Sequence, residues 1–115
     1  MYRGTTPTIK VKLKNTDLRF ETIEKIWFTL KSNIKEKTYE KEELTLNDEE
    51  KIISVKMSQE DTLSFSSGEI KIQIRFKDDL GNSFVTKICK TTMNEILKGG
   101  VIKWVKQWKL KLSYL

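Results

Sequence analysis

The residues of this chain that could do chemistry are two pairs of adjacent carboxylates and one thiol, namely Glu60-Asp61, Asp78-Asp79 and Cys89. The chain contains no histidine, so serine or cysteine triads, imidazole metal sites and histidine acid–base pairs are excluded in their usual forms. A mechanism that uses carboxylates alone stays open. Adjacent side chains diverge along the backbone, however, and both pairs stand in turn-forming sequence. We interpret them as solvated surface and turn residues.

Cys89 is the only cysteine, so no disulfide can form within the chain. It lies between Ile88 and Lys90 in strand-like sequence, where a single thiol is typically a small buried or half-buried apolar residue. No phosphate-binding loop, dinucleotide fingerprint, paired-cysteine zinc spacing or calcium loop occurs. We therefore expect a protein that is not an enzyme and that uses no cofactor and no metal.

The elements that position these residues are expected to be strands, because apolar and polar residues alternate with period two. Strands are predicted around residues 9–13, 25–32, 53–57, 70–77 and 84–91, with one or two more exposed strands in the charged segment 34–51. The predicted strands at 70–77 and 84–91 are joined by a hairpin at 78–83, where Gly81 and Asn82 favour a tight turn. Rows of apolar residues on one side of each strand predict an all-β fold of two antiparallel sheets packed face to face.

A corner between the two sheets is predicted at Ser58–Asp61. Its pattern S-x-x-D favours a single helical turn that begins at a serine cap. Such a turn can carry the chain from one sheet to the other, and Leu63 and Phe65 would then close the end of the core. A chain of 115 residues fits one domain, which we place at 1–100, followed by a C-terminal extension at 101–115.

Charge is distributed unevenly along the chain. The net charge is +6, and the extension carries four lysines and no acidic residue, so the first 100 residues are close to neutral. This argues against a nucleic-acid surface spread over the whole fold. In segment 34–51 we interpret the charges as protection of edge strands against pairing, with an acidic recognition strip as the alternative.

Large aromatic residues and neighbouring lysines are the candidates for binding a partner, because aromatic side chains dominate interface energetics. They are Trp27, Tyr39, Trp104, Lys106, Trp108, Lys109 and Tyr114. Trp27 falls on the polar side of its strand, where it either covers a neighbouring strand or contacts a partner. The extension fits both helical and strand spacing; it could fold back over a sheet, bind a protein or a second copy, or contact nucleic acid or a membrane surface.

Four sequence segments resemble a known family in order and spacing. They are the opening MYRGTTPT, the central ISVKMSQEDTLSF, the segment GEIKIQIRF with its LGN hairpin, and the closing EILKGGVI. Together they resemble small proteins encoded among the tail and baseplate structural genes of bacteriophages and prophages of Gram-positive hosts. The resemblance covers about residues 1–102 and implies an immunoglobulin-like sandwich without catalytic residues. The extension at 104–115 departs from the pattern of that family.

Two functions follow as expectations, and a third stays open. The first is a non-enzymatic phage structural or accessory module, associated with the tail or baseplate, that binds a protein or forms an oligomer. The alternative is an inhibitor from a mobile element that blocks a host defence nuclease, such as a CRISPR effector. A nucleic-acid-binding module is the third. No segment reaches the roughly 20 apolar residues that span a bilayer, so we expect the host cytoplasm or the virion.

Overall fold

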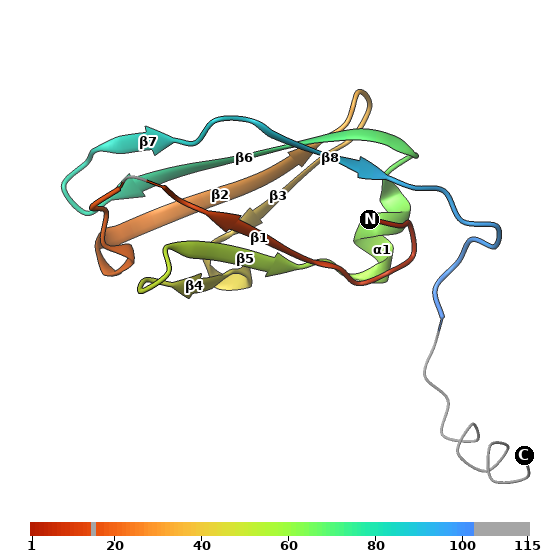
Figure 1. Cartoon of the computed structure of the whole chain (residues 1–115), viewed down its shortest axis with the longest axis horizontal. Helices are drawn as coiled ribbons and strands as arrows, with labels where there is room; N and C mark the ends of the chain where they lie inside the picture. Colours follow the sequence, from red (N-terminus) through yellow and green to blue (C-terminus); the bar gives the residue numbers. More distant parts are fainter. Residues whose placement is uncertain (15, 103–115) are drawn as a thin grey trace, which may run out of the picture.

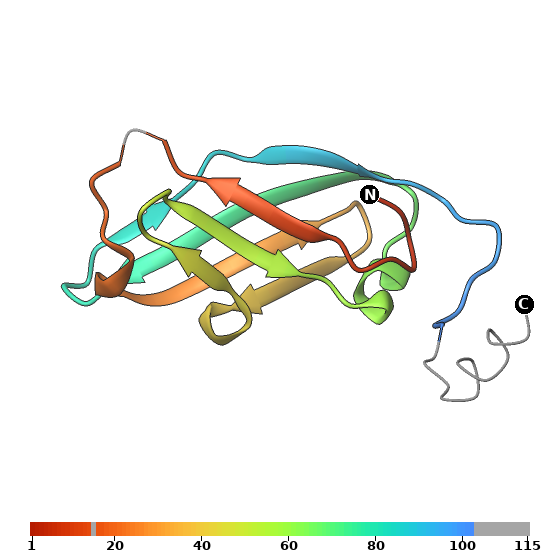
Figure 2. The same cartoon turned by 60° about the horizontal axis from the view of Figure 1, so that its bottom comes forward.

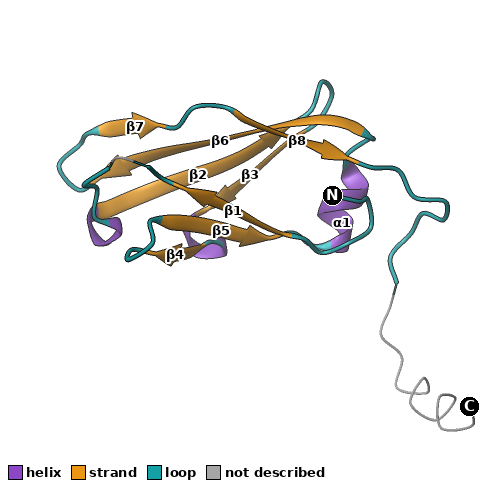
Figure 3. Cartoon of the chain, in the orientation of Figure 1, coloured by secondary structure: helices purple, strands orange, loops and turns teal. Residues whose placement is uncertain are grey.

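The computed structural model describes residues 1–14 and 16–102. Its elements are β1 (Thr8–Lys12), η1 (Phe20–Thr22), β2 (Ile23–Lys31), β3 (Glu36–Glu40), η2 (Lys41–Glu43), β4 (Thr45–Asn47), β5 (Ile52–Lys56), α1 (Gln59–Ser64), β6 (Gly68–Asp78), β7 (Ser83–Val85) and β8 (Cys89–Met93). Strands dominate (Figure 3). Within the described residues α1 is the one α-helix, and η1 and η2 are single turns of 3-10 helix.

The strands form two antiparallel sheets that pack face to face, which confirms the predicted two-layer sandwich (Figure 1). The smaller sheet has the order β1-β5-β4. The larger has the order β3-β2-β6, and both β7 and β8 pair with the free side of β6. Figure 2 shows the smaller sheet in front, with its strands crossing those of the larger sheet. β1 and β4 are thus the edges of one sheet, and β3 and β7–β8 are the edges of the other.

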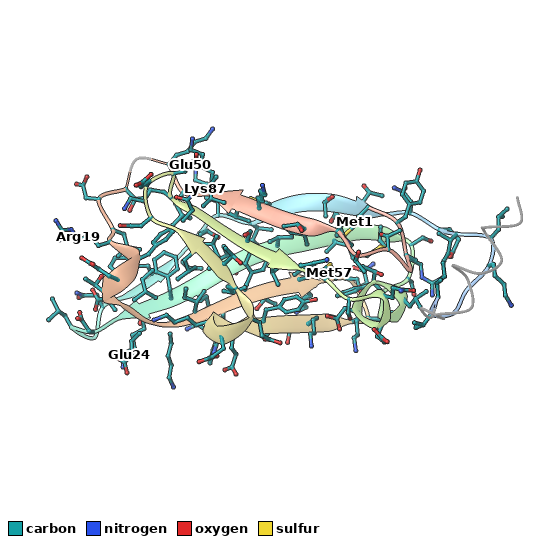
Figure 4. The ribbon with its side chains drawn as sticks, turned by 90° about the horizontal axis from the view of Figure 1, so that it is seen from below. Met1, Arg19, Glu24, Glu50, Met57 and Lys87 are labelled. Carbon is teal, nitrogen blue, oxygen red and sulfur yellow. The ribbon has the colours of Figure 1, made fainter. Side chains whose placement is uncertain are left out.

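The core lies between the sheets and is built by the period-two alternation. In β2 the side chains of Ile26, Phe28 and Leu30 are fully buried, and β6 contributes Ile70 and Ile74 in the same way. These residues face the apolar side chains of β5 across the sandwich. Figure 4 shows Met57 within the body, whereas Arg19 and Glu24 point away from it. Burial of each such side chain stabilises the fold by about 1.5–3 kcal/mol.

The corner at α1 forms as the sequence predicts. The Ser58 hydroxyl accepts a hydrogen bond of 3.1 Å from the backbone N–H of Asp61, which caps the helix. The helix carries the chain from β5 in the smaller sheet to β6 in the larger one. Phe65 is fully buried at the end of the core, whereas Leu63 is only half-buried.

The N-terminal segment is hydrogen-bonded to the end of β8 and the residue that follows it. Tyr2 forms a parallel bridge with Asn94, and the backbone N–H of Asn94 donates to the carbonyl of Met1 at 2.7 Å. The charged terminal amine of Met1 donates to the carbonyl of Thr92 at 2.8 Å. Residues 1–3 are therefore held beside the end of β8.

The last predicted strand differs from expectation. It is not one strand over 84–91 but two short ones, β7 and β8, and it continues to Met93. Cys89 pairs with Ile72, so its side chain faces the smaller sheet, yet it is exposed. The prediction that this thiol is buried or half-buried is wrong, because the hollow between β8 and β1 of the smaller sheet leaves Cys89 open to solvent.

Candidate protein-binding face

The outer face of the larger sheet carries a row of side chains from neighbouring strands. The register places Trp27 of β2 beside Glu40 of β3 on one side and Arg75 of β6 on the other. Arg75 is in turn opposite Val85 of β7. Because Ile26 and Phe76 beside them point into the core, alternation turns Trp27 and Arg75 outward. The sheet therefore brings together residues that are up to 58 positions apart in sequence, from Trp27 to Val85.

Trp27 is partly ordered by Arg75. The guanidinium carbon of Arg75 lies 5.4 Å from the centre of the Trp27 ring, a distance at which the cation is attracted to the ring face. Such a contact contributes about 0.5–1 kcal/mol at an exposed site. The indole is still 44% exposed. It is held in place in the free protein and presents half of its surface to solvent.

A bulge between β7 and β8 adds a second apolar side chain to this face. From Val85 to Cys89 the outer strand uses one residue more than β6 uses from Arg75 to Ile72, which defines a β-bulge. The bulge is stabilised by Thr86. Its hydroxyl accepts from the backbone N–H of Ile74 at 3.0 Å, and its backbone N–H donates to the Ile74 carbonyl at 2.9 Å.

The bulge leaves Ile88 54% exposed and Val85 59% exposed. Ile88 lines a shallow hollow of about 670 Å³ together with Trp27, Gln73 and Arg75. Gln73 is oriented by a hydrogen bond of 3.0 Å from its side-chain N–H to the Thr86 carbonyl. We call this surface the Trp27 face and define it as Trp27, Gln73, Arg75, Val85 and Ile88.

Charges of both signs surround the Trp27 face. Glu36, Glu40 and Glu43 line the side of the hollow formed by β3 and η2. Lys31 also lines the hollow, and the register places it between Glu36 of β3 and Lys71 of β6. Exposed apolar residues beside an arginine, within a charged rim, have the composition of protein-binding surfaces.

Tyr39 was predicted to contact a partner, and this prediction is wrong. Its side chain is 3% exposed because it lies on the inner side of β3, next to Phe28 in the register. Its hydroxyl donates to Asp61 Oδ2 at 2.7 Å. Burial, followed by this hydrogen bond and the charge of Asp61, raises the pKa of Tyr39 well above its ordinary value. Tyr39 is a core residue of the edge strand.

The remaining predicted contact residues lie outside the part of the chain that the structure describes: Trp104, Lys106, Trp108, Lys109 and Tyr114. Trp27 is the predicted residue that the structure places on an accessible face. Sequence analysis missed Arg75, Val85 and Ile88. Arg75 alternates with buried residues in β6, so its outward direction could have been inferred, but its position beside Trp27 depends on strand order.

In each of the two carboxylate pairs, Glu60-Asp61 and Asp78-Asp79, one side chain is shielded from solvent and the other is exposed. Asp78 is 7% exposed and its Oδ1 accepts from the backbone N–H of Leu80 at 2.9 Å and of Asn82 at 2.8 Å. The Asn82 side chain and these amides lower the pKa of Asp78. The turn role is confirmed, but the predicted solvation of Asp78 is wrong. Asp61 is half-buried and accepts the hydrogen bond of the Tyr39 hydroxyl, whereas Glu60 and Asp79 are exposed.

Within residues 1–14 and 16–102, no group of three metal-ligating side chains gathers in a way that could hold a metal ion. No helix of the described residues combines the length and the apolar character needed to cross a membrane. No known protein family, no curated protein and no solved structure matches the chain. What the chain binds has to be inferred from its own residues.

Proposed function

We propose that this chain is a non-enzymatic protein-binding module of a bacteriophage or prophage, which docks a partner in the tail or baseplate on its Trp27 face. The observation that carries the proposal is the pairing of an exposed Trp27 with Arg75 beside Val85 and Ile88. Tryptophan and arginine are the residues most enriched at energetic centres of protein interfaces. Here they are ordered before binding, which reduces the entropy that association costs.

The phage context rests on the sequence resemblance over residues 1–102. The strand order supports the immunoglobulin-like architecture that this resemblance implies. With β1 in the place of strand B, the smaller sheet would read B-E-D and the larger C′-C-F-G, an order compatible with an immunoglobulin-like sandwich that lacks a first strand A. A rigid sandwich of this kind suits a structural module because its outer faces keep their shape.

The test is the presence of the chain in phage particles. Particles are purified from a host that produces the phage with the wild-type chain, with Trp27→Ala or with Glu24→Ala, and the chain is quantified by mass spectrometry. Glu24 is the matched control because it is an exposed residue of the same strand that points away from the body (Figure 4). We expect wild type and Glu24→Ala in the particles and at least a tenfold loss for Trp27→Ala, because a central aromatic contact contributes about 2 kcal/mol or more.

Absence of the wild-type chain from particles would overturn the structural role. If the chain instead co-purifies with a host nuclease and inhibits it, the inhibitor function replaces the structural one. Equal incorporation of wild type and Trp27→Ala would leave the structural role standing and remove the Trp27 face from it.

A further inference from the structure

The outer edge of β1 has no strand beside it in the part of the chain that the structure describes. β1 pairs with β5 alone. The Pro7 carbonyl and the Leu13 N–H bond toward β5, so by the alternation of an antiparallel ladder the N–H and C=O groups of Thr8, Lys10 and Lys12 point the other way. An edge of five residues is therefore open for main-chain pairing.

A cleft accompanies this edge. β1 at the edge of the smaller sheet faces β7 and β8 at the edge of the larger one, and Figure 2 shows β1 and β8 along the same side of the sandwich. Two hollows of about 450 and 630 Å³ are lined jointly by these strands. The N-terminal segment, bonded to Thr92 and Asn94, closes one end of the cleft.

Apolar side chains line the cleft without filling it. Ile9 and Val11 point inward from β1 and are only half-buried. From the larger sheet, Phe84 stacks on Phe76 with ring centres 5.5 Å apart but remains 42% exposed. Cys89 also faces this space and is exposed. Inward-facing apolar groups on both walls are left in contact with solvent, which favours a ligand that brings apolar side chains of its own.

The rim of the cleft is basic. Five exposed lysines line it, Lys10, Lys12, Lys14, Lys87 and Lys90, and of these Lys90 also lies 3.8 Å from the carboxylate of Glu69. Residues 7–14 and 83–93 contain no acidic side chain. A strand that entered the cleft would direct alternate side chains inward and the others toward these lysines. Charge complementarity thus selects acidic residues for the second set.

We propose that the cleft binds an extended segment of another protein, in which apolar and acidic residues alternate, and that this segment pairs with β1 as an added strand. Main-chain hydrogen bonds to β1 supply affinity, and the apolar cleft and the lysine rim supply selectivity. The cleft borders the Trp27 face at Val85, which lines one of its hollows, but the proposal does not depend on the function proposed for that face.

Two other occupants fit the cleft less well. The chain's own extension from 103 to 115 carries four lysines and no acidic residue, so it has the same charge as the rim. The acidic edge strand β3 of a second copy carries Glu36 and Glu40, but its apolar side chain Tyr39 is buried in its own core. It cannot enter a neighbour's cleft without unfolding that edge.

The experiment selects peptides from a random displayed library of 12-residue peptides against the immobilised full chain. We expect the selected peptides to alternate apolar residues with Asp or Glu, and their affinity to fall as salt increases because the rim contacts are screened. Two variants of one residue then test main-chain pairing. Lys10→Pro removes the outward N–H and the charge, whereas Lys10→Ala removes the charge alone. We expect at least a tenfold loss of affinity for Lys10→Pro and about a two- to fivefold loss for Lys10→Ala.

Cys89 provides a second measurement. A bound strand would cover its thiol, so the rate of alkylation by iodoacetamide should fall at least about tenfold when a selected peptide saturates the chain. Trp27→Ala should leave both peptide affinity and this protection unchanged, which separates the cleft from the Trp27 face. Circular dichroism confirms that each variant is folded before its affinity is compared.

Several outcomes would overturn the proposal. Selection of basic or wholly apolar peptides would remove the charge complementarity, and a full chain that selects no peptide would show that the cleft takes none. Equal affinity of Lys10→Pro and Lys10→Ala would exclude strand addition at β1. Self-association of the chain that blocks Cys89 would assign the cleft to a second copy.

Discussion

The hydroxyl of Tyr39 donates a 2.7 Å hydrogen bond to Asp61 Oδ2, which ties the edge strand β3 to helix α1. Lys37 adds to this contact, because its ammonium lies 5.2 Å from the Tyr39 ring centre and 3.9 Å from Asp61 Oδ1. The edge of the larger sheet and the corner between the sheets are therefore fixed to each other by one buried ring and one carboxylate.

Substitution of Tyr39 tests this tie. Tyr39→Phe keeps the ring and removes the hydrogen bond, so we expect the free energy of unfolding to fall by about 1 kcal/mol. Tyr39→Ala also removes the buried ring and should cost about 3–5 kcal/mol. Urea denaturation followed by circular dichroism measures both. An unchanged midpoint for Tyr39→Phe would mean that water replaces the hydroxyl at Asp61.

Arg3 is expected to stabilise the end of α1. Its Nε donates to the Phe65 carbonyl at 2.8 Å and its Nη2 donates to the Leu63 carbonyl at 3.0 Å. Arg3→Ala leaves these carbonyls without partners and should lower the free energy of unfolding by about 1.5–3 kcal/mol. Arg3→Lys should recover less than half of this, because an ammonium lacks the planar fork of donors.

The control for Arg3 is Glu95→Gln. Arg3 also pairs with Glu95, whose side chain is largely exposed, and exposed ion pairs contribute little to stability because solvent screens them. If Glu95→Gln destabilises the chain as much as Arg3→Ala, the ion pair and not the helix end accounts for the effect.

Asp78 is expected to make stability depend on pH in the acid range. Its pKa in the folded chain is lowered from 3.8, chiefly by the Asn82 side chain. A lowered pKa contributes stability that is present above the unfolded value and is lost as pH falls through the folded one. Wild type should therefore melt at a higher temperature than Asp78→Asn above about pH 5, and the difference should shrink below about pH 4.

Thermal melts of both chains across this range measure the difference. Asp48 and Glu95 also have lowered pKa values, and comparison of the two chains cancels their contributions. A difference in melting temperature that stays constant down to pH 2 would show that the charge of Asp78 does not matter to the turn.

Trp27 and Phe28 are neighbours on opposite faces of β2, and their substitutions should separate binding from folding. Trp27 is 44% exposed, so Trp27→Ala removes the contact with Arg75 and the partial burial of the ring, and it should cost about 1–2 kcal/mol of stability. Phe28→Ala empties a fully buried site and should cost about 3–5 kcal/mol. Chemical denaturation compares the two. A large loss for Trp27→Ala would make Trp27 a structural residue instead of a binding one.

Local patterns predicted much of this fold because strands and caps depend on nearby residues. Alternation around 25–32 and 70–77 identified β2 and β6, and the serine of S-x-x-D identified the start of α1. The same alternation placed Trp27 on the outer side of its strand. Alternation did not predict that Tyr39 faces the core. Tyr39 is the one buried residue of the edge strand β3, and the other residues of this strand are polar or charged, so no apolar row is visible in the sequence.

The sequence by itself determined the alternation of apolar and polar residues in the strands, the helix start at Ser58 and the lack of histidine chemistry. These properties depend only on residue types and short spacings. Tertiary structure decided which side chains meet. Arg75 lies next to the Trp27 ring because β6 is the neighbour of β2 in the sheet. Ile88 reaches the same face because the bulged segment between β7 and β8 runs along the other side of β6. Cys89 faces inward but is exposed, because a hollow separates β8 from β1 of the smaller sheet, and such spacing between sheets depends on tertiary packing.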